Sequence, residues 1–134
     1  MQVPSGSRNQ TFVRVQGERI QLTVDAHAIA DKLRSAVAEG GAAAPATYFA
    51  FQRDCLAVVK ASTRTPTAFF VAAGIAAAVA DRLESGRGVD QGQAGGLLAY
   101  ANRLADCLSQ HADDANHQDW IDLVSGIYPP DRGH

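Results

Sequence analysis

The sequence FFVAAGIAAAVA, residues 69–80, runs for twelve positions without a charged or strongly polar side chain. A helix that crosses a bilayer needs about 20 such residues, and an Asp-Arg pair follows this run at once. The run therefore predicts a buried helix and not a membrane span. Because a Thr-Pro pair opens it, we expect a central helix from Thr67 to about Ser85, with many alanines that let other helices approach closely.

Four further segments show the apolar spacing of three and four residues that is typical of amphipathic helices. Their ends carry capping residues: aspartate, asparagine or proline at the start, and glycine, serine or a polar break at the end. The segments begin at Asp25, Pro45, Asp90 and Asn116 and end before Gly40, Ser62, His111 and Pro129. The sequence thus predicts a mainly α-helical bundle of about five helices.

Residues 11–24, TFVRVQGERIQLTV, alternate apolar and polar side chains around Gly17. Such alternation on both sides of a glycine-containing turn is typical of a β-hairpin. We expect this N-terminal hairpin to pack on one side of the bundle, because an isolated hairpin is only marginally stable in water. We expect the first ten residues to form a flexible arm and residues 11–130 to form a single domain. Residues 131–134 should form a short tail.

Residues 11–33, TFVRVQGERIQLTVDAHAIADKL, join the expected hairpin directly to the first helix. This segment resembles the start of phage tail-assembly chaperones. The likeness covers less than a fifth of the chain, and it consists of alternating hydrophobic residues around a glycine turn. It implies no functional residue in this chain.

Composition and charge exclude several classes of protein. The chain has 12 basic and 14 acidic side chains, a formal charge of −2, and 46% hydrophobic residues. A disordered chain is far less hydrophobic, and a typical nucleic-acid-binding domain is clearly basic. We therefore expect a folded domain whose partner is neither nucleic acid nor a membrane.

Cysteine usage and the N-terminal sequence indicate a cytoplasmic protein. The sequence MQVPSGSRNQ lacks the cationic and apolar regions of a secretory signal. Cys55 and Cys107 are far apart and have no CxxC spacing, so they predict buried free thiols. Ten arginines against two lysines, with alanine as the commonest residue, indicate a GC-rich bacterial genome.

The densest polar cluster of the sequence spans residues 111–122, between the last two predicted helices. His111 and His117 are six positions apart, which does not place both on one face of a continuous helix. We interpret the cluster as a solvated loop with an acidic cap on the last helix. The alternative is a small metal-binding protein or enzyme with His111, Asp114 and His117 as ligands. No residue is predicted to be catalytic, and no cofactor is expected.

A second alternative is a helical nucleic-acid-associated subunit of a ribonucleoprotein or of a phage or mobile-element assembly. This function requires scattered arginines to meet on one face. The candidates are Arg14, Arg19, Arg53 and Arg64. Because aspartates are interspersed among the basic residues, solvated faces are the favoured interpretation.

Aromatic residues provide the candidate partner-binding surface. Tyr48, Phe49 and Phe51 cannot all point into one core from a helix, so at least one ring should face outward. Trp120 and Tyr128, near the C-terminus, are further candidates. Together with a flat alanine-rich helix and a free hairpin edge, they favour a non-enzymatic protein–protein interaction module that forms a homodimer or binds another protein. Such a module is an adaptor, assembly factor, inhibitor or small subunit of a larger complex.

Overall fold

The computed structural model describes the backbone of residues 3–63, 66–86, 96–112 and 118–127, and within these ranges the side chains from residue 17 onward except that of Glu18. Its helices are α1 (Val3–Ala38), α2 (Pro45–Ala61), α3 (Thr67–Glu84), α4 (Gly96–Gln110) and α5 (Gln118–Ile127), with a short 3-10 turn, η1 (Gly41–Ala43), before α2. The predicted mainly helical single domain with five helices is confirmed.

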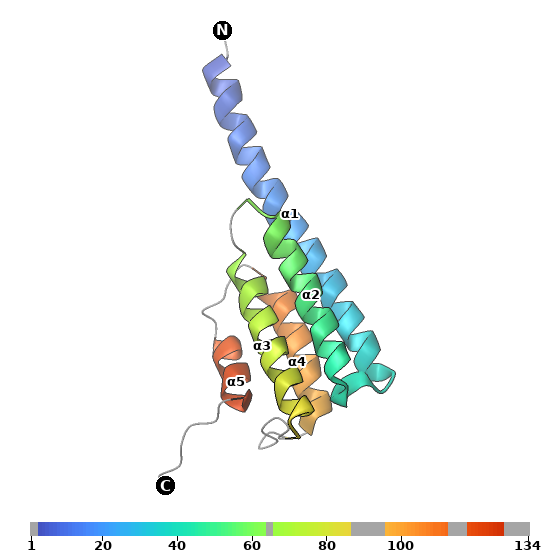
Figure 1. The fold of residues 1–134 in the computed structure, drawn as a ribbon. Helices are drawn as coiled ribbons and strands as arrows, with labels where there is room; N and C mark the ends of the chain where they lie inside the picture. Colours follow the sequence, from blue (N-terminus) through green and yellow to red (C-terminus); the bar gives the residue numbers. More distant parts are fainter. Residues whose placement is uncertain (1–2, 64–65, 87–95, 113–117, 128–134) are drawn as a thin grey trace, which may run out of the picture.

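The helices α1 to α4 run side by side in alternating directions, and the short α5 lies beside α3 and α4 (Figure 1). The closest pairings are α2 with α3 and α1 with α4, while α1 also contacts α2. An ion pair of 3.1 Å between Lys32 Nζ and Asp54 Oδ2 bridges α1 and α2. In the part of the chain that the structure describes, no helix is long and apolar enough to cross a membrane.

The α3 helix supplies much of the core, as its apolar run predicts. Small side chains let α2 approach it closely, since alanines leave its surface flat. The outer side of α3 carries Phe70 and Gly74, which are exposed. The buried residues of α3 are Ala68, Phe69, Ala72, Ala73, Ile75, Ala76, Val79 and Ala80.

The connection between α1 and α2 follows the predicted glycine and proline signals. Gly40 has a φ of 98°, a left-handed conformation that glycine adopts without steric cost. A Cβ on Gly41 would lie 2.8 Å from the carbonyl oxygen of Ala36. The backbone at this turn therefore passes too close to the end of α1 for a side chain to fit at position 41. Pro45 then occupies the start of α2, where its missing N–H costs no helical hydrogen bond.

The predicted N-terminal β-hairpin is not confirmed. Residues 11–24 lie within α1, and the described residues contain no strand. The helix that packs on the core after Asp25 extends back through this stretch. In this conformation the backbone groups of residues 11–24 form helical hydrogen bonds, and Leu22 lies against the core. Gly17 lies inside the helix instead of in a turn, at a cost of about 1 kcal/mol relative to alanine. The segment that resembles phage tail-assembly chaperones is accordingly helical throughout.

The N-terminal half of α1 extends past the other helices (Figure 1, dark blue). α1 has 36 residues whereas α2 has 17, which correspond to lengths of about 54 and 26 Å at the helical rise per residue. Leu22 is the most N-terminal of the described side chains that pack against the core. Residues 3–10, expected to be a flexible arm, are part of this helix.

Candidate functional site

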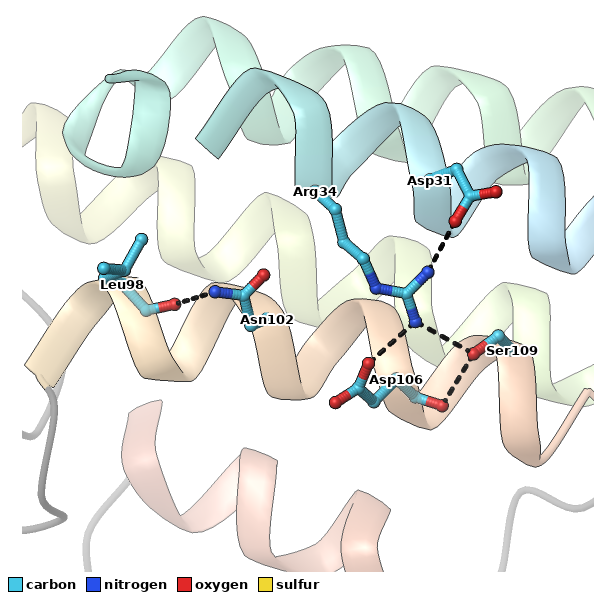
Figure 2. A network of polar contacts seen from close by, with 6 residues as sticks. All are labelled: Asp31, Arg34, Leu98, Asn102, Asp106 and Ser109. Carbon is cyan, nitrogen blue, oxygen red and sulfur yellow. Dashed lines mark hydrogen bonds and ion pairs between the residues drawn. The ribbon is translucent and has the colours of Figure 1, made fainter. Parts of the chain in front are cut away.

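A polar network fixes α1 against α4 (Figure 2). Arg34 donates hydrogen bonds to Asp31 and Asp106, each at 2.7 Å, and to Ser109 Oγ at 3.3 Å. The hydrogen bond with Asp106 raises the pKa of Arg34 above its usual value, against the opposing effect of burial. Because the guanidinium bridges two helices and is matched by carboxylates on both, this network links α1 to α4.

A polar cleft of about 190 Å³ lies between α4 and α5. It is lined by Arg103, Asp106, Cys107, Gln110, Asp119 and Leu123. At its edge, His111 Nε2 lies 3.0 Å from Asp119 Oδ2. This contact ties the end of α4 to the first turn of α5, where a carboxylate also interacts favourably with the helix dipole.

The structure brings together only part of the predicted metal site. His111 is mostly buried and in contact with Asp119, while Asp114 and His117 lie outside the described residues. Among the residues that are described, no group of three or more His, Cys, Asp or Glu side chains is arranged to hold a metal ion. The metal-binding alternative thus stays a prediction.

Both cysteines are free and buried, as predicted. Burial raises the pKa of the Cys55 thiol to about 12, and it raises the pKa of the Cys107 thiol to about 12 as well. Since the thiolate is the reactive form, these cysteines are protonated and unreactive near neutral pH. Cys107 therefore contributes a packed thiol, and not a nucleophile, to the cleft.

The predicted aromatic surface divides between core and solvent. Tyr48 is buried, and its hydroxyl donates a hydrogen bond of 2.5 Å to the carbonyl of Ala42. Phe51 and Trp120 are also buried, so the structure gives a partner no access to these three side chains. Phe49 is 39% exposed, in agreement with the expectation that one ring of the trio faces outward. Tyr128 lies outside the described residues.

The predicted arginine set is only partly described. Arg19 is exposed on α1, and Arg53 is exposed on α2. The side chain of Arg14 and the whole of Arg64 lie outside the described residues. A nucleic-acid-binding face therefore stays a prediction that the structure does not test.

The feature that sequence reasoning missed is an exposed apolar pair on α1, at the two positions that flank Leu22. Ile20 is 65% exposed and Val24 is 54% exposed. In a strand, Ile20 and Val24 would lie on the same face as Leu22. In a helix they are one turn apart and lie on the outer side of α1, away from Leu22. The spacing of four residues was visible in the sequence, although it is also compatible with the alternation of a strand.

Comparison with known protein families, with curated proteins and with solved structures found no match to the chain.

Proposed function

We propose that this protein is a non-enzymatic protein–protein interaction module whose binding element is the N-terminal part of α1, up to Val24. The observation that carries the proposal is the exposure of Ile20 and Val24 on α1. They flank Leu22, the most N-terminal described side chain that packs on the core, and from there the helix continues past the bundle (Figure 1). Apolar side chains one turn apart on a helix form the kind of ridge that enters a partner's hydrophobic groove. The protein then acts as an adaptor, assembly factor, inhibitor or small subunit of a larger complex.

Helix energetics support a partner for this segment. Residues 3–19 include Gly6 and Gly17, together with several serine, threonine and valine residues, all of which are weaker helix formers than alanine. An isolated helix of this length and composition is marginal in water. Burial of the Ile20 and Val24 side chains against another protein would stabilise it.

Site-specific cross-linking tests the proposal. A photoreactive benzoylphenylalanine replaces Ile20 in the full-length protein, in the cells that naturally produce it, and a matched variant carries it at Lys60, which is exposed on α2. Position 20 should yield a covalent adduct with a protein, which mass spectrometry identifies as this chain or another one. Equal yields at positions 20 and 60 would contradict the proposal.

We also propose a cytoplasmic location in a bacterium. Two buried free thiols suit a reducing compartment, and the arginine-rich, lysine-poor composition suits a GC-rich genome. Fractionation of the producing cells checks the location: recovery in the periplasm or the medium would contradict it.

The contact between His111 and Asp119 favours a second candidate function, binding of a metal ion at the end of α4. A histidine oriented by a carboxylate is a common metal ligand, and Asp114 and His117 would complete the set. Calorimetric titration with Zn²⁺ tests this candidate. The His111→Ala variant should lose binding while His27→Ala, altered at an exposed position on α1, keeps it; equal affinities in both variants exclude it.

A further inference from the structure

Arg103 on α4 is a partly buried cation that lines the cleft between α4 and α5. In the part of the chain that the structure describes, its guanidinium makes no ion pair and no hydrogen bond. Arginine side chains that leave the surface are normally paired, because removing a charge from water costs free energy. The guanidinium of Arg103 is therefore available to an anion that enters the cleft.

The two carboxylates of the cleft are engaged with other basic side chains. Asp106 lies three positions after Arg103 on the same helix, a spacing at which the two could pair. It instead accepts a hydrogen bond of 2.7 Å from Arg34 on α1 (Figure 2). Asp119 on α5 lies 3.0 Å from His111. Both carboxylates line the cleft, and neither forms an ion pair with Arg103.

The charged groups of the cleft surround the thiol of Cys107. Burial is the main cause that raises the pKa of this thiol, and the charges of Asp119 and Asp106 raise it as well. The positive charge of Arg103 acts against them. Because interactions between charges weaken with distance, all three charged groups lie close to the same small cavity.

These groups favour a compact ligand with a single negative charge. A carboxylate matches the planar guanidinium through two parallel hydrogen bonds. A phosphate carries more negative charge, which would face the two aspartates without a second free cation to balance it. The cleft volume of about 190 Å³ suits a small molecule, and Leu123 in its lining offers contact to a short apolar chain.

We infer that the cleft between α4 and α5 binds a small organic monocarboxylate, whose carboxylate group accepts hydrogen bonds from the Arg103 guanidinium. The apolar chain of the ligand lies against Leu123. The amide of Gln110, which is exposed at the cleft, is a further hydrogen-bond donor for the carboxylate. This site uses none of the residues of the proposed binding element on α1, so the inference goes beyond the proposed function and does not depend on it.

An NMR titration of the isotope-labelled, full-length protein with sodium butyrate tests the inference. Butyrate has one carboxylate and a short apolar chain, and butyramide is a neutral control of the same shape. EDTA is present throughout, so that no metal ion at His111 contributes. The Arg103→Met variant removes the guanidinium, and its matched control, Arg53→Met, makes the same change at an exposed position of α2. Circular dichroism checks that each variant folds.

We expect butyrate to shift the backbone signals of Arg103, Gln110 and Leu123 with one saturable dissociation constant. Arg103→Met should weaken binding by about tenfold or more, because the charge-assisted hydrogen bonds are lost. Arg53→Met should bind as the wild type does, and butyramide should bind the wild type about tenfold more weakly than butyrate or not at all. Arg103→Lys keeps the charge but loses the planar fork, so its affinity should lie between those of Arg103→Met and the wild type.

Four results overturn the inference. Shifts that do not saturate with butyrate show that the cleft does not bind it. Equal affinities for butyrate and butyramide show that the carboxylate is not recognised, and equal affinities of Arg103→Met and Arg53→Met show that Arg103 is not the ligand's partner. Inorganic phosphate that binds the same residues more tightly than butyrate assigns a different class of anion. The cross-linking yield at position 20 is measured independently of all four, so the proposed function is tested separately.

Discussion

The Tyr100 side chain on α4 meets Gly126 on α5 at a distance that leaves no room for a side chain. A Cβ on Gly126 would lie 2.7 Å from Tyr100 Cε2. On the same side of α5, the Tyr100 hydroxyl donates a hydrogen bond to the backbone carbonyl of Leu123. Glycine at position 126 therefore lets the aromatic ring approach the backbone of α5 closely, and this contact helps to position that short helix.

Replacement of Gly126 by alanine should loosen α5. The new methyl group displaces the Tyr100 ring, and overpacking of this kind costs about 1–3 kcal/mol. Urea unfolding followed by fluorescence measures the cost, because the protein's single tryptophan, Trp120, is buried on α5. The control is Gly74→Ala on the exposed side of α3, where a Cβ meets nothing within 4 Å. It should stabilise the protein by about 0.5–1 kcal/mol, and equal effects of the two substitutions would contradict the packing described.

The neighbouring rings of α2 should differ sharply in their contribution to stability. Phe51 is buried, so Phe51→Ala should lower the free energy of unfolding by about 3–5 kcal/mol. Phe49→Ala should lower it by less than about 1 kcal/mol, because much of that ring already contacts water. Chemical denaturation measures both values. A larger loss for Phe49→Ala would show that Phe49, and not Phe51, belongs to the core.

Local sequence signals were sufficient to predict the buried side and the ends of most helices. In α4, the apolar spacing predicts a core stripe of Leu97, Ala101, Leu104 and Leu108, because spacing of three and four residues determines which side of a helix is covered. The last three of these residues are fully buried, and Leu97 is partly buried. Gly40 and Pro45 likewise mark the turn where the structure has it. These signals depend on neighbours in the chain, so no tertiary information was needed to use them.

The N-terminal segment could not be predicted in the same way. Ile20, Leu22 and Val24 alternate as strand residues do, but Leu22 packs on the core while the other two point outward from a helix. Whether such a stretch becomes strand or helix depends on the surface that receives it, and that surface is formed by distant parts of the chain. The exposed ridge of α1 was missed for this reason.

The three aromatic residues of α2 show which part of the candidate site could not be predicted from the sequence. Helical spacing indicates that Tyr48, Phe49 and Phe51 cannot share one side, but not which ring faces outward. The choice is made by η1, because the Tyr48 hydroxyl bonds to the carbonyl of Ala42 within it. With Tyr48 held inward, its neighbour Phe49 is left at the surface.

The buried cysteines should make the fold sensitive to alkali. Burial raises both thiol pKa values to about 12, whereas a cysteine in the unfolded chain ionises near about 8.5. Above that pH the folded state holds more protons than the unfolded state, so stability that is fully present below pH 8.5 is lost as the pH rises towards 12. We expect a loss of about 1 kcal/mol per cysteine at pH 9.5 relative to pH 7.

Urea titrations at these two pH values measure the loss. In Cys55→Ala/Cys107→Ala, the difference between pH 7 and pH 9.5 should shrink, whatever the cost of the substitutions at pH 7. Burial also raises the pKa of Tyr48 to about 12, but an unfolded tyrosine ionises near about 10. Its contribution therefore begins above the range measured. An unchanged pH dependence would show that the thiols do not titrate differently on unfolding.

The Arg34 network should stabilise the protein modestly, and more than the ion pair between Lys32 and Asp54 does. Arg34 bridges to Asp106 and Ser109 on α4 with its side chain about one-third exposed, whereas Lys32, which pairs with Asp54, is 67% exposed. Exposed pairs are screened by water and contribute little. We expect Arg34→Met to lower the free energy of unfolding by about 1 kcal/mol and Lys32→Met by about 0.3 kcal/mol or less.

Thermal unfolding at low and high salt separates the two contributions of Arg34. Added NaCl screens the charge interaction, so the gap between wild type and Arg34→Met should narrow at 1 M NaCl. A residual gap should remain, because the hydrogen bond between Arg34 and Ser109 does not depend on a second charge. If Lys32→Met proved the more damaging of the two, α1 would be held mainly by α2, and the pairing of α1 with α4 would not be the contact that positions its extended N-terminal half.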